Sequence, residues 1–405
     1  MKKIIVISGS PTHPTHAGGR ASLRCWVEAY RAAGIEVHLA IIRFDYGDEM
    51  AMRQAWGPDR CTFLDYEYPR RHWYDRWWLR LARLFRPHPW VPYRIDDWCG
   101  TPLLTSIREL AARLQPDCVH VEYVFFSRLL ECFGPGVYKI LNTNDVFAGR
   151  ERLYLQYGRP PEWFFTTREE EARGVARADC IIAIQKHEGE YFKQITRQRV
   201  VTISTLVHLQ SPRPPATSEP TLVFIGSDYV ANVDAIKFFC TEIWPLILAA
   251  LPAARLEIYG GVCRRELDVV PGTRLAGSVA DLSVPYQRAW LVICPLRFGT
   301  GLKRKTIEAL GWGKALVTTA TGAEGLEDGR GRAFLQANAP AEFARLCLQV
   351  LSDDSLRQRL EQAAYEFATA QNEQQAARQL ELMTFAGLLP VAKPVPRQIL
   401  VNSAT

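Results

Sequence analysis

A glycine-bearing loop followed by closely spaced lysines is the strongest chemical signal in the sequence. The segment 295–314 begins where an apolar run ends, continues through Gly299 and Gly301, and then takes on a helical pattern that carries Lys303 and Lys305. Glycines let an anion approach the backbone, and free N–H groups at a helix start bind phosphate. Two cations in a first helical turn oppose the helix dipole unless a bound anion compensates them. The pattern predicts a phosphate site; the alternative is a solvated basic run.

Polar residues also stand at the ends of two apolar runs in the first half of the chain. His120 and Glu122 alternate at the end of one run, and Asn144 with Asp145 follows the next. Ligands of open parallel sheets bind at the carboxyl ends of the strands, so these side chains are candidates for contacts with a substrate. The alternative is that they cap the strand ends without any ligand.

Length and composition restrict the class of protein. The chain has 405 residues, of which 48% are hydrophobic and 23% charged, which predicts a globular protein of two or three domains. No apolar run approaches the roughly 18 residues that cross a membrane, and the first apolar run is interrupted too early for a signal peptide. The ten cysteines lack metal-site spacing. We therefore expect a cytoplasmic protein without a metal.

The net charge of +6 is concentrated in one segment. Residues 70–94 hold seven arginines and one aspartate, and the rest of the chain is balanced. From Trp73 onward, aromatic and leucine side chains gather on one side of a helical wheel and most arginines on the other. This pattern suits an anionic membrane surface, to which the protein would bind peripherally from the cytoplasm. The alternative is that the apolar face packs onto the first domain. Nucleic acid is not an expected partner, because its binding proteins usually spread positive charge over a whole domain.

Strand-like and helix-like segments alternate in both halves of the chain, which predicts βαβ units and parallel sheets. The strand-like runs are 3–8, 35–42, 117–121, 137–142, 179–184, 200–203, 221–226, 255–259, 290–295 and 315–319. The helix-like segments include 20–33, 233–251, 302–312, 339–352 and 355–369.

The domain organisation follows from the proline-rich segment 210–220, whose composition is typical of a linker. We predict an α/β protein with two doubly wound Rossmann-like domains, 1–209 and 221–371, that face each other across a cleft. Residues 372–405 would form a helix that crosses back to the first domain, followed by a tail.

Taken together, these segments resemble family four glycosyltransferases, the retaining group with the two-domain GT-B fold. Segment 295–314 resembles the donor-binding signature of that family. The other similar segments are 13–20 and 178–184 in the first domain and 222–235, 256–261, 275–279 and 318–326 in the second. The resemblance covers about residues 1–370 and implies that the second domain binds a nucleotide-diphosphate sugar while the first binds the acceptor.

The resemblance also implies roles for individual residues. Lys303 and Lys305 would hold the donor diphosphate during catalysis, Glu308 would accept hydrogen bonds from the ribose, and Val279 would meet the base through its backbone. Asp145 would contact a sugar near the reacting atoms. Further implied donor contacts are Gly18, Gly19, Gly226, Gly299, Thr300, Gly301 and Leu302. The acceptor-side candidates are His120, Glu122 and Asn144.

The sequence departs from the family pattern at two places. Thr300 stands where many members have the first of two glutamates that contact the donor sugar. The Arg-Lys pair that other members carry after the first strand of the second domain is absent, and Ser227, Asp228 and Asn232 occupy that region. Lys303 and Lys305 must then supply most of the positive charge for a diphosphate.

We therefore expect a retaining, hexosyltransferase-like enzyme of bacterial glycan or glycoconjugate biosynthesis. Its donor would be a nucleotide sugar, its acceptor a glycan, a lipid-linked molecule or a protein, and no metal or other cofactor is expected. One alternative is a nucleotide-sugar epimerase on the same fold, with His120, Glu122 and Asp145 as acid and base groups. Another is a catalytically idle nucleotide-sugar-binding or scaffold protein, which the presence of Thr300 keeps open.

Overall fold

The computed structural model of the chain describes residues 1–14, 18–69, 72–82, 84, 90–159, 161, 163–267 and 270–390, apart from the side chains of Gly18 and Arg76. The end of the predicted segment 372–405, from residue 391 onward, lies outside the described residues. Of the predicted basic segment, Arg70, Arg71, Arg83 and Arg86 also lie outside them. The chain divides into two compact units, one formed by Met1–Thr205 with the segment that begins at Ala376, and one formed by Leu206–Gln375.

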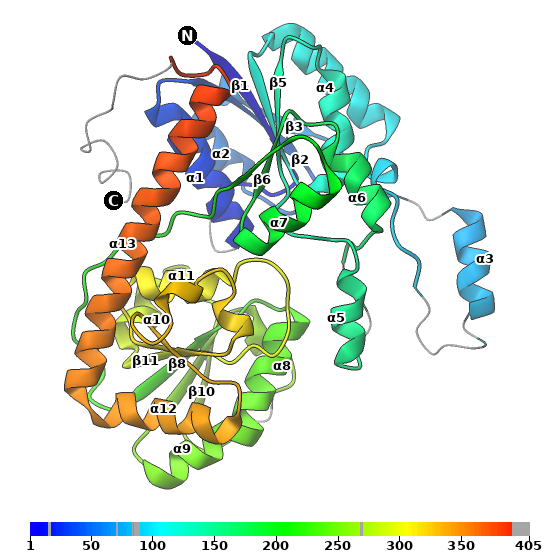
Figure 1. Ribbon diagram of the computed structural model, residues 1–405. Helices are drawn as coiled ribbons and strands as arrows, with labels where there is room; N and C mark the ends of the chain where they lie inside the picture. Colours follow the sequence, from blue (N-terminus) through cyan, green and yellow to red (C-terminus); the bar gives the residue numbers. More distant parts are fainter. Residues whose placement is uncertain are drawn as a thin grey trace. The chain divides into compact units, whose positions relative to one another are not determined.

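The first unit is built on a seven-stranded sheet whose order is β3-β2-β1-β4-β5-β6-β7 (Figure 1). Every neighbouring pair is parallel, and the direction in which strands are added reverses between β1 and β4. The strands are β1 Lys3–Ser8, β2 Glu36–Ile42, β3 Cys61–Leu64, β4 Cys118–Glu122, β5 Tyr138–Asn142, β6 Cys180–Ala183 and β7 Arg199–Thr202. The helices are α1 Gly18–Ala32, α2 Glu49–Trp56, α3 Trp73–Ala82, α4 Thr101–Leu114, α5 Arg150–Gln156, α6 Arg168–Val175 and α7 Lys186–Ile195.

Both faces of this sheet are covered, which explains why its strands read as continuous apolar runs. Side chains alternate between the faces of a strand, so Ile4 packs in one core with Trp26 of α1. Ile5 packs in the other core with Ile107 of α4 and Phe125.

The second unit is built on a six-stranded parallel sheet with the order β10-β9-β8-β11-β12-β13, which reverses between β8 and β11. The strands are β8 Thr221–Ile225, β9 Arg255–Tyr259, β10 Thr273–Gly277, β11 Leu291–Cys294, β12 Leu316–Thr318 and β13 Leu335–Gln336. The helices are α8 Val230–Phe238, α9 Trp244–Ala250, α10 Ser283–Arg288, α11 Arg304–Gly311, α12 Pro340–Ser352 and α13 Asp354–Phe385. The predicted α/β class with two doubly wound domains is confirmed.

The structure differs from the sequence prediction in several elements. The predicted helix 355–369 and the predicted crossover helix from residue 372 are not separate: one continuous helix, α13, extends from Asp354 to Phe385, because no proline or glycine interrupts the chain within it. The predicted helix 233–251 is divided by a π-helical turn at Phe239–Ile243, just before Pro245, which lacks the N–H that a regular helix would use. The edge strands β3, β10 and β13 were not among the predicted strands.

The proline-rich segment 210–220 lies along the second unit, and the boundary between the units falls between Thr205 and Leu206. Gln210 donates its backbone N–H to the carbonyl of Gly311 at 2.8 Å, and the indole N–H of Trp290 donates to the carbonyl of Thr217 at 3.1 Å. The segment is therefore bound in place by hydrogen bonds.

Within the described part of the chain, no helix combines the length and the apolar character that a membrane-spanning segment requires. The longest helix, α13, has 32 residues but is rich in glutamine, glutamate and arginine.

Candidate functional site

The predicted phosphate-binding segment lies where the strand order of the second sheet reverses. The loop after β8 begins at Gly226 and leads into α8, while the loop after β11 passes through Gly299 and Gly301 into α11. Ligands of open parallel sheets bind at this point, outside the carboxyl ends of the two strands. The topology therefore brings the glycine loop to the position that favours a ligand.

Helix α11 begins slightly later than the sequence pattern predicts. Lys303 is its N-cap residue and Arg304 its first residue, so Lys305 lies in the first turn and Lys303 immediately before it. Gly299 and Gly301 have φ angles of 140° and 69°, which side chains with a Cβ atom rarely adopt. The glycines are needed for this loop conformation, which ends with Lys303 at the start of the helix. Thr300 and Leu302 are half-buried within it.

The ammonium group of Lys303 is held by backbone carbonyls and by one carboxylate. It donates to the carbonyl oxygens of Gly301 at 2.7 Å and Gly299 at 3.3 Å, and to Oε2 of Glu324 at 2.7 Å. Its side chain is 6% exposed. Glu324 follows β12, and the sequence analysis assigned it no role. A bound anion would have to share Lys303 with this carboxylate or replace it.

The ammonium group of Lys305 is poorly solvated. It donates to Oδ1 of Asn232 and lies 4.6 Å from the centre of the Phe224 ring. Burial lowers the pKa of Lys305 to about 8; the positive charge of Lys303 acts in the same direction, and the Cys294 thiol and the Glu308 carboxylate act in the opposite one. A bound anion would favour the charged form and raise this pKa.

Asn232 is one of the three residues that occupy the region where other family members carry an Arg-Lys pair. Its Nδ2 donates to the backbone carbonyl and to Oγ of Ser227, each at 3.1 Å, which turns Oδ1 toward Lys305. The side chain is 6% exposed at the start of α8. It thus positions the lysine by a neutral hydrogen bond from the neighbouring loop.

Glu308 lies one turn further along α11. Its Oε1 accepts a hydrogen bond from Nε of Arg304 at 2.7 Å, and both side chains are about four-fifths buried. The nearby Tyr286 hydroxyl is buried, and burial, followed by the charge of Glu308, raises its pKa well above the usual range. Glu308 therefore pairs with Arg304 through Oε1, and its Oε2 is the oxygen that a hydroxyl group could approach.

The loops after β8, β9 and β10 approach each other through glycine backbones. A Cβ on Gly260 would lie 2.2 Å from the carbonyl oxygen of Gly226, and Gly260 has a φ angle of 98°. The backbone N–H of Gly260 donates to the carbonyl of Gly277 at 2.7 Å. Val279 follows β10 at the same edge of the sheet and is half-buried.

The first-domain candidates His120, Glu122 and Asn144 form one polar network. His120 is fully buried; its Nδ1 lies 2.9 Å from the Tyr30 hydroxyl and its Nε2 lies 3.1 Å from Oε1 of Glu122. The Glu122 carboxylate also accepts hydrogen bonds from Nδ2 of Asn142 at 3.1 Å and of Asn144 at 2.5 Å. This arrangement favours the alternative that these groups stabilise the strand ends, because a buried carboxylate must be satisfied inside the protein.

Asp145 is 8% exposed and already engaged. Its Oδ1 accepts the N–H of Val146 at 2.9 Å, and its Oδ2 lies 3.2 Å from Nη1 of Arg150, whose side chain is 6% exposed. The carboxylate therefore orders the loop that leads into α5 and is neutralised there by an arginine.

Tyr123 is a residue at the reversal point of the first sheet that sequence reasoning missed. It follows β4 directly, has a φ angle of 71°, and its hydroxyl would lie 3.1 Å from a Cβ on Gly19 near the start of α1. Gly18 is the first residue of that helix. A positive φ at a bulky residue costs roughly 1–3 kcal/mol and is found most often at functional sites. The sequence signal that could have indicated Tyr123 is an aromatic residue directly after a strand that ends in polar residues.

One comparison with known protein families concerns the second unit. Residues 219–353 match the family model for glycosyl transferases group 1. The matched region extends from the start of β8 to the end of α12 and contains Lys303, Lys305, Glu308 and Glu324. No curated protein matches the chain in a sequence search.

Solved structures resemble the chain over nearly its whole length. HepE of Anabaena, solved with UDP and glucose, is 12% identical with a TM-score of 0.64 and covers 94% of this chain and 99% of its own. Sucrose-phosphate synthase of Thermosynechococcus elongatus is 17% identical with a TM-score of 0.68, covering 96% and 100%. The pneumococcal O-GlcNAc transferase GtfA, solved with UDP and GlcNAc, is 9% identical with a TM-score of 0.65, covering 95% and 99%. The chain thus has the GT-B fold of these glycosyltransferases.

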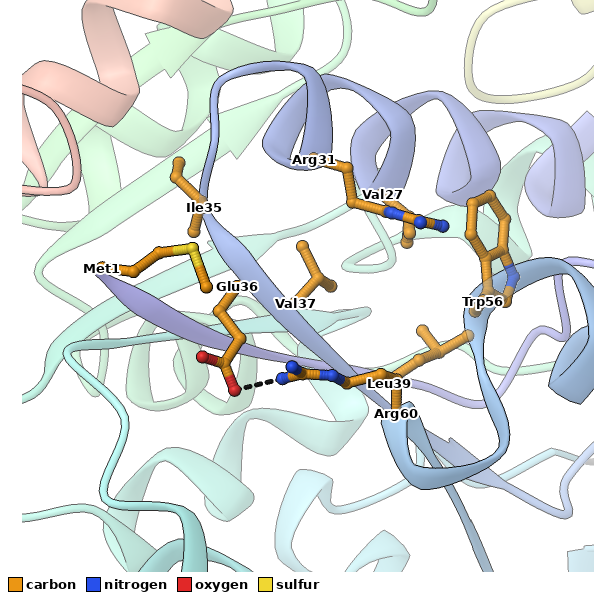
Figure 2. Close-up of a pocket in the computed structure, with 9 residues that line it drawn as sticks. All are labelled: Met1, Val27, Arg31, Ile35, Glu36, Val37, Leu39, Trp56 and Arg60. Atoms are coloured by element: carbon orange, nitrogen blue, oxygen red, sulfur yellow. Dashed lines mark hydrogen bonds and ion pairs between the residues drawn. The ribbon is translucent and has the colours of Figure 1, made fainter.

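The cavity drawn in Figure 2 is separate from the residues discussed so far. It has a volume of about 180 Å³ and lies beside α1 at the amino end of β2. Its arginines are already engaged, Arg60 with Glu36 and Arg31 with the ring of Trp56 at 5.5 Å. In the part of the chain that the structure describes, no group of three or more His, Cys, Asp or Glu side chains is arranged to hold a metal ion.

Proposed function

We propose that the chain is a retaining glycosyltransferase that moves a sugar from a nucleotide-diphosphate donor to an acceptor, in bacterial glycan or glycoconjugate biosynthesis. The observation that carries this proposal is the position of Lys303 and Lys305 beside the glycine loop, at the strand reversal of a unit that matches glycosyl transferases group 1. HepE and GtfA, which share the fold, were solved with UDP, and this supports a nucleoside diphosphate as the leaving group.

The positive charge needed by a diphosphate would come from this chain itself. Lys303 would pass from Glu324 to a phosphate oxygen, and Lys305 would gain a counter-ion in its buried position. Backbone N–H groups of the glycine loop would add hydrogen bonds. Groups that are already oriented toward developing charge stabilise a leaving group effectively. We propose accordingly that no metal ion is required.

The remaining steps are part of the same proposal. Glu308 would accept a hydrogen bond from a ribose hydroxyl with the oxygen that Arg304 does not engage. The acceptor would attack on the face from which the diphosphate departs, and a phosphate oxygen would take the acceptor's proton, so that the configuration of the sugar is retained. An epimerase would need acid and base groups that reach the sugar, and the buried positions of His120 and Glu122 do not favour that alternative.

The donor site is tested by binding. Melting temperature and calorimetric affinity would be measured with UDP, GDP, ADP, TDP and CMP for the wild type, Lys303→Ala and Lys305→Ala. We expect one diphosphate to bind, and each variant to bind it at least about tenfold more weakly, since hydrogen bonds to charged groups contribute about 1.5–3 kcal/mol. Lys237→Ala, which removes an exposed lysine from α8, is the matched control and should bind normally. Unchanged binding in both site variants would refute the assignment.

The reaction itself is tested separately, with the donor that binds and a panel of glycan, lipid-linked and protein acceptors. We expect a product whose anomeric proton coupling in NMR shows the configuration of the donor sugar. Inversion would overturn retention, an isomerised donor would point to an epimerase, and donor binding without turnover would point to an idle binding protein.

A further inference from the structure

Helix α3 leaves its large apolar side chains in water. Trp73 is 73% exposed, Trp77 59%, Trp78 47% and Leu81 51%, and Leu84, just beyond the helix, is 75% exposed. The expectation that this face packs onto the first domain is therefore wrong. Of the fifteen large hydrophobic side chains that are exposed in the described residues, six lie between positions 73 and 84. A concentration of this kind marks an interaction site rather than ordinary surface.

Polar contacts attach the start of this helix to the first unit. Nε2 of His72 lies 3.2 and 3.3 Å from the carboxylate oxygens of Asp97, and the His72 ring stacks on Tyr74 with 5.1 Å between ring centres. The guanidinium of Arg94 lies 5.1 Å from the centre of the Tyr74 ring. The helix is thus fixed at one end, while the tryptophans beyond Tyr74 are presented outward. Figure 1 shows α3 standing apart from the sheet of the first unit.

The charge around this face identifies the kind of partner. Residues 70–94 carry seven arginines and one aspartate, and Arg80 is exposed one turn after Trp77 on the same helix. Tryptophan side chains prefer the headgroup level of a bilayer, and arginines next to them bind lipid phosphates. Exposed indoles together with a local charge of +6 therefore match an anionic lipid surface.

We propose that α3 docks the protein on anionic membranes, with Trp73, Trp77 and Leu81 inserted at the headgroup level and the exposed Arg80 bound to lipid phosphates. The helix is ten residues long and amphipathic, so it lies in the interface and does not cross the bilayer. This docking is independent of the donor site and would hold whether or not the proposed reaction is correct.

The test is flotation of the full chain with lipid vesicles. Vesicles of phosphatidylcholine alone would be compared with vesicles that contain about one third phosphatidylglycerol. We expect the protein to float with the anionic vesicles and not with the neutral ones, and to be released as salt screens the arginines. Arg80→Gln should weaken binding about fivefold, the effect of one cation near an anionic surface.

The variant Trp73→Ser/Trp77→Ser/Leu81→Ser should lose vesicle binding by more than about tenfold, with an unchanged melting temperature because the replaced side chains are exposed. The matched control, Tyr46→Ser/Leu246→Ser, removes side chains that are 80% and 46% exposed elsewhere and should float like the wild type. Failure of the wild type to float with anionic vesicles, or equal flotation of the triple variant, would overturn the proposal. So would a wild type that ignores vesicles and self-associates through this face, seen in light scattering as a larger mass that the triple variant loses.

Discussion

The lowered pKa of Lys305 makes donor affinity depend on pH in a way that can be calculated. Its pKa is lowered to about 8 from the ordinary value of 10.5, because burial disfavours the ammonium form. Only the charged form attracts a diphosphate, so affinity is full below this pKa and is lost as the pH rises through it. With a pKa of about 8, about nine-tenths of the lysine is charged at about pH 7 and about one-tenth at about pH 9. The apparent Kd should therefore rise about tenfold.

The assay is isothermal titration calorimetry with the nucleotide sugar that binds, because its diphosphate carries no titratable proton in this range. Lys305→Arg keeps the positive charge at every pH used, so its profile should be flat even though arginine fits the site less well. Lys305→Ala should bind weakly with the same flat profile. A flat wild-type profile, or an equal slope in Lys305→Arg, would refute the argument that this lysine's burial controls its charge.

Three further predictions concern two carboxylates and one glycine. Glu324→Gln should tighten diphosphate binding by roughly threefold in calorimetry, because it removes the carboxylate that competes for Lys303 at 2.7 Å. The effect is modest because the Glu324 side chain is 38% exposed to solvent. Weaker binding would mean that Glu324 positions the lysine instead. Burial raises the pKa of Glu171 to about 7, so between about pH 4.5 and about pH 7 the folded chain holds a proton that the unfolded chain has released. The free energy of unfolding should therefore fall by up to about 3 kcal/mol as the pH rises through this range. Melting curves of Glu171→Gln should lack this pH dependence, and an identical pH dependence in the variant would assign it to another group. Gly260→Ala should lower the free energy of unfolding by about 2–4 kcal/mol in urea titration, because the added Cβ would meet the Gly226 carbonyl. The control Gly134→Ala, at a position with open space around it, should leave the free energy of unfolding nearly unchanged. Equal losses in the two variants would contradict the close approach of the Gly226 and Gly260 backbones.

The glycine loop and its two lysines could be proposed as one candidate site from the sequence because they are close along the chain. Gly299, Gly301, Lys303 and Lys305 remain neighbours whatever the rest of the fold does. The topology of both sheets was predictable in outline for a similar reason, since each buried strand is a local apolar run. The edge strands β3, β10 and β13 were missed because they are only partly buried and contain polar residues or glycine, so none of them is a continuous apolar run.

The partners of the lysines could not be predicted in the same way. Glu324 follows β12 and Asn232 lies in α8, so their contacts with α11 and the loop before it depend on which loops meet at the sheet edge. The spacing of residues along the sequence also does not show how deeply a side chain is buried. The alternation of His120 and Glu122 identified the correct end of β4, but not that α1 covers them. For α3, a packed helix and an exposed one have the same amphipathic pattern.

The hydrogen bonds that bind the proline-rich segment to the second unit determine where this unit can be excised. Gln210 bonds to Gly311 at the end of α11, the side chain of Asn372 exchanges hydrogen bonds with both backbone groups of Val207, and Thr217 receives the indole N–H of Trp290. A fragment that starts at Thr221, where composition suggests a cut, would remove these partners. A self-sufficient fragment has to extend from Leu206 to at least Gln375, so the autonomous piece is longer at both ends than the stretch that family comparison recognises.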